Sequence, residues 1–184
     1  MANKLKKPVL FLTLGFPGSG KTYFSERWAK DLNLLHIRAS KLRKIIFEKP
    51  QHNKLEHRQM RRVMQYILAE LLKTGASVIC DFNANLRKSR AEFRKVARAA
   101  GADSLLVWIQ TPFALTQKRV KLRNKYESGL KNRHRKAITQ EILYEMRDSL
   151  QPPVREKYLV LDGTRPYRTS RRRLMNYLRS NKYI

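Results

Sequence analysis

Eight consecutive residues near the start of the chain have the types and the spacing that suit phosphate binding. The run Gly15-Phe16-Pro17-Gly18-Ser19-Gly20-Lys21-Thr22 matches the pattern GxxxxGK followed by Ser or Thr. In such a loop the glycines permit a tight turn that aims backbone N–H groups at phosphates, the lysine reaches the β- and γ-phosphates, and the last hydroxyl ligates Mg²⁺. The sequence therefore predicts a site for a nucleoside triphosphate with Mg²⁺, in which Lys21 binds phosphate and Thr22 binds the metal.

A second feature that suits this chemistry is an aspartate directly after a buried apolar run. Asp81 follows Val78, Ile79 and Cys80. A carboxylate at the end of a neighbouring parallel strand holds Mg²⁺ directly or through water in sites of this kind. Because an apolar run before an aspartate is a weak pattern, a carboxylate that merely caps a loop remains the alternative.

The phosphate loop needs a buried strand before it and a helix after it, and the flanking residues predict both. Residues 9–14 form a short, nearly continuous apolar run that ends at a glycine, as expected of a buried parallel strand. After Gly20 the apolar residues Phe24, Trp28 and Leu32 recur at helical spacing. The loop is therefore predicted to connect a buried strand to a helix.

Apolar patterns along the rest of the chain continue this alternation. Further strands are predicted at residues 34–37, 76–81, 104–109 and 158–161, and further helices at residues 53–72, 93–100, 113–123, 138–150 and 171–178. Alternating strands and helices imply crossover connections onto a parallel sheet that is covered on both faces. We predict an α/β fold of one domain spanning residues 1–184, a length that ordinarily forms a single core.

The composition is that of a folded chain in a reducing compartment. Hydrophobic residues make up 42% of the 184 residues, which exceeds what a disordered segment contains. Cys80 is the only cysteine, so no internal disulfide is possible and a reduced, cytoplasmic setting is expected. The apolar stretches are all too short to span a bilayer, so no membrane partner is expected.

The formal net charge of +27 requires a separate explanation. A positive field of this size attracts nucleic acid or another polyanion, because neutralised phosphates release their counterions. In the tail, arginines alternate with Tyr167, Tyr177 and Tyr183, a mixture able to contact phosphates and to stack on bases. The alternative is a solvated basic surface, and Leu174 and Leu178 favour a tail helix that packs on the core with its charges outward.

Taken in order, four parts of the chain resemble the P-loop kinases related to zeta toxin and to the 5′-hydroxyl polynucleotide kinases. They are GFPGSGKT at 15–22, ASKLR at 39–43, CDFNANLRKSR at 80–90, and the pair Arg119 and Arg123 on one helix. The resemblance implies an AAA-type ATP-binding domain with the nucleoside-kinase-like fold, a three-layer, doubly wound sheet of five parallel strands. It also implies transfer of the γ-phosphoryl group of ATP to a hydroxyl.

The resemblance further implies roles for individual residues. The residues that hold the phosphates of ATP and Mg²⁺ are Lys21, Thr22 and Asp81. The residues that face the acceptor or its phosphate are Ser40, Arg43 and Arg90. Arg123, with Arg119 nearby, lies in a basic lid at about residues 121–138 and meets the charge that develops in the transition state.

Ser40 departs from the pattern of those kinases, which usually carry at this position an aspartate that accepts the proton of the attacking hydroxyl. A serine is no base at neutral pH without an activating partner, and a positioned base contributes about 10²- to 10⁴-fold. Either Asp81 or another carboxylate such as Glu48 substitutes, or transfer is slow, or the chain does not act as a kinase.

Three functions therefore stay open. The first is an ATP-dependent kinase whose hydroxyl acceptor is anionic, with a nucleic-acid end as one example. The second is an ATPase that binds nucleic acid and uses ATP only as a switch. The third is a small-molecule kinase that acts on an antibiotic, a sugar or a nucleotide-sugar.

Overall fold

Five parallel strands form one sheet in a computed structural model that describes residues 5–51, 53–82, 84–128 and 137–184. The sheet order is β2-β3-β1-β4-β5. The strands are β1 (Val9–Leu14), β2 (Leu35–Arg38), β3 (Val78–Asp81), β4 (Asp103–Gln110) and β5 (Tyr158–Asp162). In register, Leu12 of β1 lies beside Cys80 of β3 and Leu106 of β4. Because all the strands are parallel, their carboxyl ends meet at one edge of the sheet.

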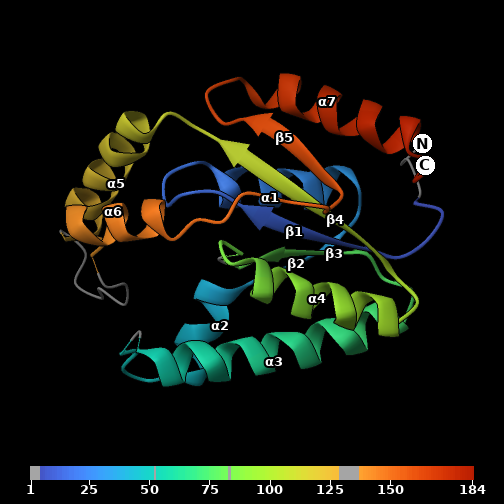
Figure 1. The fold of residues 1–184 in the computed structure, drawn as a ribbon, viewed down its shortest axis with the longest axis horizontal. Coiled ribbons are helices and arrows are strands. Elements are labelled where there is room, and N and C mark those ends of the chain that lie inside the picture. The colour runs from blue at the N-terminus through green and yellow to red at the C-terminus, as the bar shows by residue number, and fades with distance from the viewer. Residues whose placement is uncertain (1–4, 52, 83, 129–136) are drawn as a thin grey trace.

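The helices form two layers around the sheet and a group at its edge. They are α1 (Lys21–Asp31), α2 (Ala39–Ile46), α3 (Lys54–Lys73), α4 (Arg87–Ala99), α5 (Phe113–Ser128), α6 (Gln140–Asp148) and α7 (Tyr167–Ser180). Helices α1 and α7 cover one face, α3 and α4 cover the other, and α5 and α6 lie beyond the carboxyl ends of the strands (Figure 1). The predicted three-layer α/β fold with five parallel strands is confirmed.

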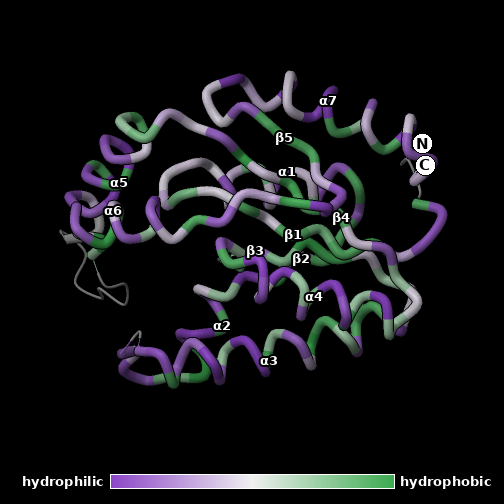
Figure 2. Tube along the Cα trace, in the orientation of Figure 1, coloured by the Kyte–Doolittle hydropathy of each residue, from purple (hydrophilic) through white to green (hydrophobic). Residues whose placement is uncertain are grey.

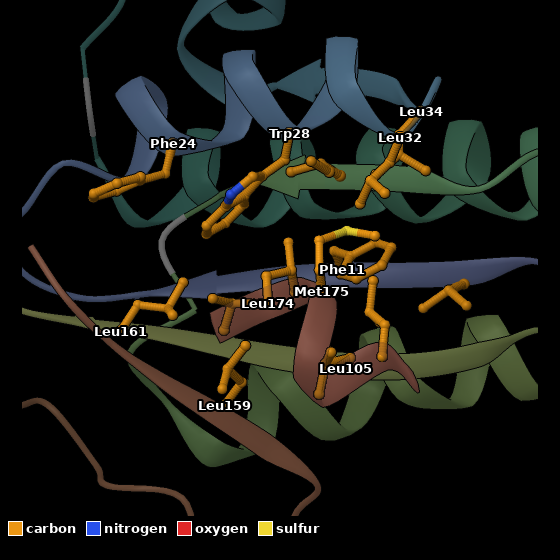
Figure 3. Close-up of a cluster of buried hydrophobic side chains, with 14 of the residues drawn as sticks. Phe11, Phe24, Trp28, Leu32, Leu34, Leu105, Leu159, Leu161, Leu174 and Met175 are labelled. Atoms are coloured by element: carbon orange, nitrogen blue, oxygen red, sulfur yellow. The ribbon is translucent and has the colours of Figure 1, made fainter. Parts of the chain in front are cut away.

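Two apolar cores hold the layers together, and β1 contributes to both. Phe11 packs with Trp28 of α1 and Leu174 of α7 on one face of the sheet (Figure 3). Leu12 packs on the opposite face with helices α3 and α4. Alternate residues of a strand point to opposite faces, so a strand covered on both sides must be apolar throughout. Figure 2 shows this as hydrophobic colouring along the central strands.

Most of the predicted elements are present, with four main differences. Helix α4 begins at Arg87, six residues before the predicted start at residue 93. Helix α2 at Ala39–Ile46 was not predicted, because it has only eight residues and follows β2 without a loop. Helix α5 extends five residues beyond the predicted end at residue 123. Helix α7 begins at Tyr167, directly after Pro166, four residues before the predicted start. No helix in the described part of the chain is long and apolar enough to cross a membrane.

Arg90 is buried in a network of hydrogen bonds, a position that the sequence did not indicate. Its side chain is 0% exposed and donates to both carboxylate oxygens of Glu156, which is itself 3% exposed. It also donates to the carbonyl oxygens of Ala84, Asn85 and Gln151. Burial raises the pKa of Glu156, but hydrogen bonds and charge from Arg90 and Arg94 outweigh burial, so the net pKa lies below its ordinary value. We therefore replace the predicted acceptor contact of Arg90 with a role in tying α4 to the segment before β5.

We expect Arg90→Met to lower the free energy of unfolding by about 3–5 kcal/mol, because it leaves the Glu156 carboxylate buried without its main partner. Urea denaturation of the full chain measures this loss. Arg94→Met is the matched control, since Arg94 binds the same carboxylate but is 31% exposed, and we expect it to cost about 1 kcal/mol or less. Equal losses for the two variants would contradict the structural role of Arg90.

Candidate active site

The phosphate loop leaves β1 through backbone conformations that favour glycine. Gly15 has φ of +148° and Gly18 has φ of +83°. A Cβ atom at Gly15 would lie 2.6 Å from the carbonyl oxygen of Ile109, and one at Gly18 would lie 2.7 Å from that of Thr116. Both positions therefore require glycine for conformation and for space. These contacts place the loop against β4 and α5.

The N-terminus of α1 is open for an anion. Gly20, its N-cap residue, has φ of +106°, and among the described residues no side chain caps the helix and no acidic residue lies in its first turn. The first N–H groups of a helix have no partners within the helix, and the helix dipole adds partial positive charge there. The loop and this helix end together therefore form a site suited to phosphate.

Lys21 spans the phosphate loop. Its Nζ donates to the carbonyl oxygens of Gly15 at 2.7 Å and Phe16 at 2.8 Å. Burial lowers the pKa of Lys21 to about 8, while the charge of Asp81 raises it and the charge of Arg123 lowers it further. The ammonium group is thus held inside the loop, within electrostatic reach of both an aspartate and an arginine that the sequence assigned to the same site.

Thr22 and Asp81 meet at the carboxyl ends of β1 and β3. The Thr22 hydroxyl donates to Oδ2 of Asp81 at 2.6 Å. Hydroxyl and carboxylate oxygens are the hard donors that Mg²⁺ prefers, and Mg²⁺ usually keeps several waters and takes few protein ligands. These two side chains therefore fit the predicted Mg²⁺ site. His36 Nε2 lies 3.9 Å from the same carboxylate oxygen, and burial lowers the pKa of this histidine, which favours its neutral form.

A pocket of about 1190 Å³ opens at this edge of the sheet. That volume exceeds what a single drug-sized ligand needs, so it has space for a nucleotide and a second molecule. The predicted site residues that line it are Gly15, Pro17, Gly18, Gly20, Lys21, Thr22, Ser40, Arg43, Asp81, Arg119 and Arg123. The structure thus brings together residues that lie more than 100 positions apart in sequence.

The two arginines of α5 occupy different places in this pocket. Arg119 donates to the carbonyl oxygens of Gly18 and Gly163, each at 3.2 Å, so it joins the phosphate loop to the turn after β5. Arg123 lies one helical turn further along, and its charge lowers the pKa of Lys21. The geometry of Arg119 suits positioning of the loop, and that of Arg123 suits direct contact with phosphate.

The wall formed by α2 and α3 carries Ser40 and Arg43. Ser40 lies in the first turn of α2 and lines the pocket. Arg43 is 7% exposed, forms an ion pair with Glu56 and lies 3.2 Å from Nδ1 of His57. Glu56 therefore neutralises much of the charge that Arg43 would offer to a ligand. The sequence could not reveal this pairing from its local pattern.

Many lining residues were not identified from the sequence, and two of them have side chains that suit the chemistry of the site. Asn85 is 5% exposed, and its Oδ1 has no hydrogen-bond partner among the residues that the structure describes. Glu145 of α6 also lines the pocket, and with Asp81 it supplies the carboxylates of the described lining. Glu48, which the sequence offered as a replacement base, is not part of that lining. For Asn85, the position four residues after Asp81 is the sequence feature that could have suggested a place in the site.

The predicted lid at about residues 121–138 is only partly described. Its first residues belong to α5, and residues 129–136 lie outside the described residues. The segment before α6 is connected to α5 by a hydrogen bond from the Asn124 side chain to the carbonyl oxygen of Ile138 at 2.8 Å. Phe113 and Tyr144 add an aromatic contact between the two helices. A lid function for this region stays a prediction.

The glycine-rich loop and the sheet order define the P-loop kinase fold. Residues 10–153 match the AAA domain family, and the chain belongs to this family. No curated protein sequence matches the chain. The relation to zeta toxin and to polynucleotide kinases is finer than this match and stays a prediction.

Several of the solved structures similar to the chain are described as kinases. A sugar kinase from a Janibacter species has a TM-score of 0.69 at 16% identity, covering 93% of this chain and 94% of that one. The APS kinase of Mycobacterium tuberculosis, in complex with AMPPNP and APS, has a TM-score of 0.68 at 20% identity, covering 94% and 98%. A gluconokinase from Sinorhizobium meliloti has a TM-score of 0.68 at 17% identity, covering 98% of both chains. At these identities the similarity shows the fold alone.

We expect the affinity for ATP with Mg²⁺ to fall as the pH rises through about 8, the pKa of Lys21 in the free protein. Above this pH the neutral amine of Lys21 must regain a proton before it can bind phosphate as an ammonium, which costs up to about tenfold in affinity per pH unit. Isothermal titration calorimetry at several pH values measures this. Lys21→Arg is the control, because arginine keeps its charge and its affinity should stay level over the same range. A parallel fall in both proteins would rule out Lys21 as the titrating group.

Proposed function

We propose that the chain is an Mg²⁺-dependent kinase that transfers the γ-phosphoryl group of ATP to a hydroxyl of an anionic acceptor. The observation that carries this proposal is the convergence of Lys21, Thr22, Asp81 and Arg123 on one pocket large enough for two molecules. Membership of the AAA domain family and the fold shared with sugar, APS and gluconate kinases support it.

The nucleotide side of the pocket suits stabilisation of a phosphoryl group in transfer. Backbone N–H groups of the loop and the first turn of α1 would bind the phosphates, with Lys21 across the β- and γ-phosphates. Thr22 and Asp81 would hold Mg²⁺, which when bound neutralises charge on the phosphate oxygens. Arg123 would face the γ-phosphate, where its guanidinium offsets the charge of the transition state. Arg119 would keep the loop in place.

The acceptor side would be the part of the pocket between α2, α4 and α6. Its lining includes Lys44, whose charge favours an anionic acceptor, while the charges of Arg43 and Arg61 are largely compensated by Glu56 and Glu92. The Oδ1 of Asn85 would accept a hydrogen bond from the acceptor, since a buried polar atom without a partner costs about 1–3 kcal/mol and a ligand relieves this cost. Arg90 and the backbone N–H of Gln151 both bind the Asn85 carbonyl and hold this residue in place.

The reaction would be an in-line displacement at the γ-phosphorus. The acceptor hydroxyl oxygen forms the new P–O bond, the bond from the γ-phosphorus to the β–γ bridging oxygen breaks, and ADP leaves. Because the transition state is loose, most of the catalysis comes from position and charge, and the hydroxyl proton passes to solvent water. The absence of an aspartate at position 40 is therefore compatible with transfer at a reduced rate.

We expect the chain to transfer label from γ-labelled ATP to at least one acceptor from a panel of phosphorylated sugars, APS and 5′-hydroxyl oligonucleotides. Asp81→Asn should reduce the transfer rate by about 10²- to 10³-fold, because it removes the charge opposite Mg²⁺. Asp103→Asn is the control for loss of one carboxylate, since Asp103 is the exposed first residue of β4 and lies outside the pocket lining, at the opposite edge of the sheet. Release of ADP without acceptor-dependent transfer would contradict the kinase proposal.

We expect Ser40→Asp to raise the turnover number by about 10²-fold or more, because it places a base on the wall of the pocket where the kinases that the sequence resembles usually carry one. Ser40→Ala should leave turnover unchanged, because the serine is not the base. Steady-state kinetics with a saturating acceptor measure both variants. A large loss of activity in the alanine variant would show that Ser40 already contributes to the reaction.

Ser40 and the charge of +27 also favour a second candidate, an ATPase that binds nucleic acid and uses ATP as a switch. The two candidates differ in a direct way. A switch would hydrolyse ATP without phosphorylating an acceptor, and its nucleic-acid affinity would differ between the ATP-bound and ADP-bound forms. A kinase that uses a small acceptor would show neither property.

A further inference from the structure

The outer surface of α7 carries charge that the proposed catalytic site does not use. Leu174, Met175 and Leu178 are buried against the sheet, so this helix covers the face opposite α3 and α4 (Figure 1). Arg168, Arg172 and Arg179 are exposed along one flank of the helix, beside the buried Met175, which lines a surface hollow with them. At 100° and 1.5 Å per residue, these three arginines fall within about 40° of one another and are spaced about 6 and 10 Å apart along the helix. We call them the α7 stripe.

The α7 stripe lines a surface hollow of about 490 Å³, together with Arg171. Arg171 forms an ion pair with Asp31 of α1 at 2.5 Å. Within the described residues, the three stripe arginines form no ion pair. The hollow therefore presents uncompensated guanidinium groups to a ligand.

Charge on α7 is arranged unfavourably for the isolated protein. Residues 163–184 contain seven basic residues and no aspartate or glutamate. Arg168 and Arg172 are four residues apart on one face, and like charges at this spacing destabilise a helix. In α3 and α4, by contrast, Arg61 pairs with Glu92. A bound polyanion would remove the repulsion on α7.

The tyrosines of this region face the protein. The Tyr167 hydroxyl donates to Asp31 at 2.7 Å, Tyr177 is half-buried, and Tyr183 is 6% exposed. The predicted stacking of these rings on bases is therefore not available. Proteins that bind single strands combine basic grooves with exposed aromatic rings, whereas duplex backbones are bound by charge and shape alone.

We propose that the α7 stripe binds the phosphate backbone of a nucleic-acid duplex without reading its sequence. The guanidinium groups are spaced along a rigid helix, and each would pair with a phosphate and release a counterion. The proposal does not depend on kinase activity, because none of the three arginines lines the large pocket.

Fluorescence anisotropy of a short labelled DNA duplex with the full chain tests this directly. Arg168→Gln/Arg172→Gln/Arg179→Gln should weaken binding about tenfold or more and reduce the slope of log K against log salt by about 2 to 3, since each lost phosphate contact changes it by about 0.9. Arg58→Gln/Arg62→Gln/Arg98→Gln is the control, because it removes the same charge from exposed positions on α3 and α4. The control should keep most of the wild-type affinity and slope.

Several results would overturn the proposal. Equal weakening by the two triple variants would show that only the net charge matters. Tighter binding to a single-stranded oligonucleotide of the same sequence would contradict the choice of a duplex. Binding to phosphatidylglycerol vesicles that depends on the α7 stripe, without duplex binding, would assign the surface to lipid. Far-UV circular dichroism of both variants checks that the helices are retained, as expected because glutamine and arginine have similar helix propensities.

Discussion

The site depends on a reversal of the chain between β1 and α1 that brings backbone N–H groups and the Lys21 ammonium to one point. Gly15 and Gly18 permit it, because a side chain at either position would collide with the backbone of a neighbouring element. Lys21 then bridges two carbonyl oxygens of the loop. The surrounding fold serves this arrangement. The central position of β1 places the loop next to Asp81 at the end of β3, and α5 brings its arginines over the open side.

Acidic residues are scarce in this chain, and this limits the number of positive charges that they can compensate. There are 14 of them against 41 lysines and arginines. Buried glutamates compensate arginines at two points where a positive charge would otherwise lie inside the protein, Glu56 with Arg43 and Glu156 with Arg90. Asp81 lies beside Thr22 in the pocket. The surplus of positive charge is therefore left on the surface, where it raises the local concentration of anionic ligands and is screened by salt.

The parts of the structure that were predictable from the sequence are those with a strong local pattern. The apolar run of β1, the glycine spacing of the loop and the helical spacing of α1 each depend on residues close together in the chain, and all three are present. Asp81 was predictable because a buried parallel strand delivers its last residue to a known edge of the sheet.

The parts that were not predictable depend on contacts between distant segments. Arg90 lies 66 residues from Glu156, and nothing in its own segment distinguishes a buried arginine from a ligand-binding one. The unpartnered oxygen of Asn85 becomes visible only when the loop after β3 is packed. The tyrosines of α7 illustrate the same limit, because a sequence of alternating arginine and tyrosine suits either base stacking or core packing, and only the position of the sheet decides between them.

A crystal structure of the full chain with AMPPNP and Mg²⁺ tests the phosphate-binding role of the loop most directly. We predict that the triphosphate lies inside the loop from Gly15 to Thr22, that the Lys21 ammonium contacts the β- and γ-phosphates, and that Thr22 and Asp81 hold Mg²⁺ directly or through water. A nucleotide bound elsewhere on the protein, or a phosphate loop without ligand at saturating nucleotide, would contradict it.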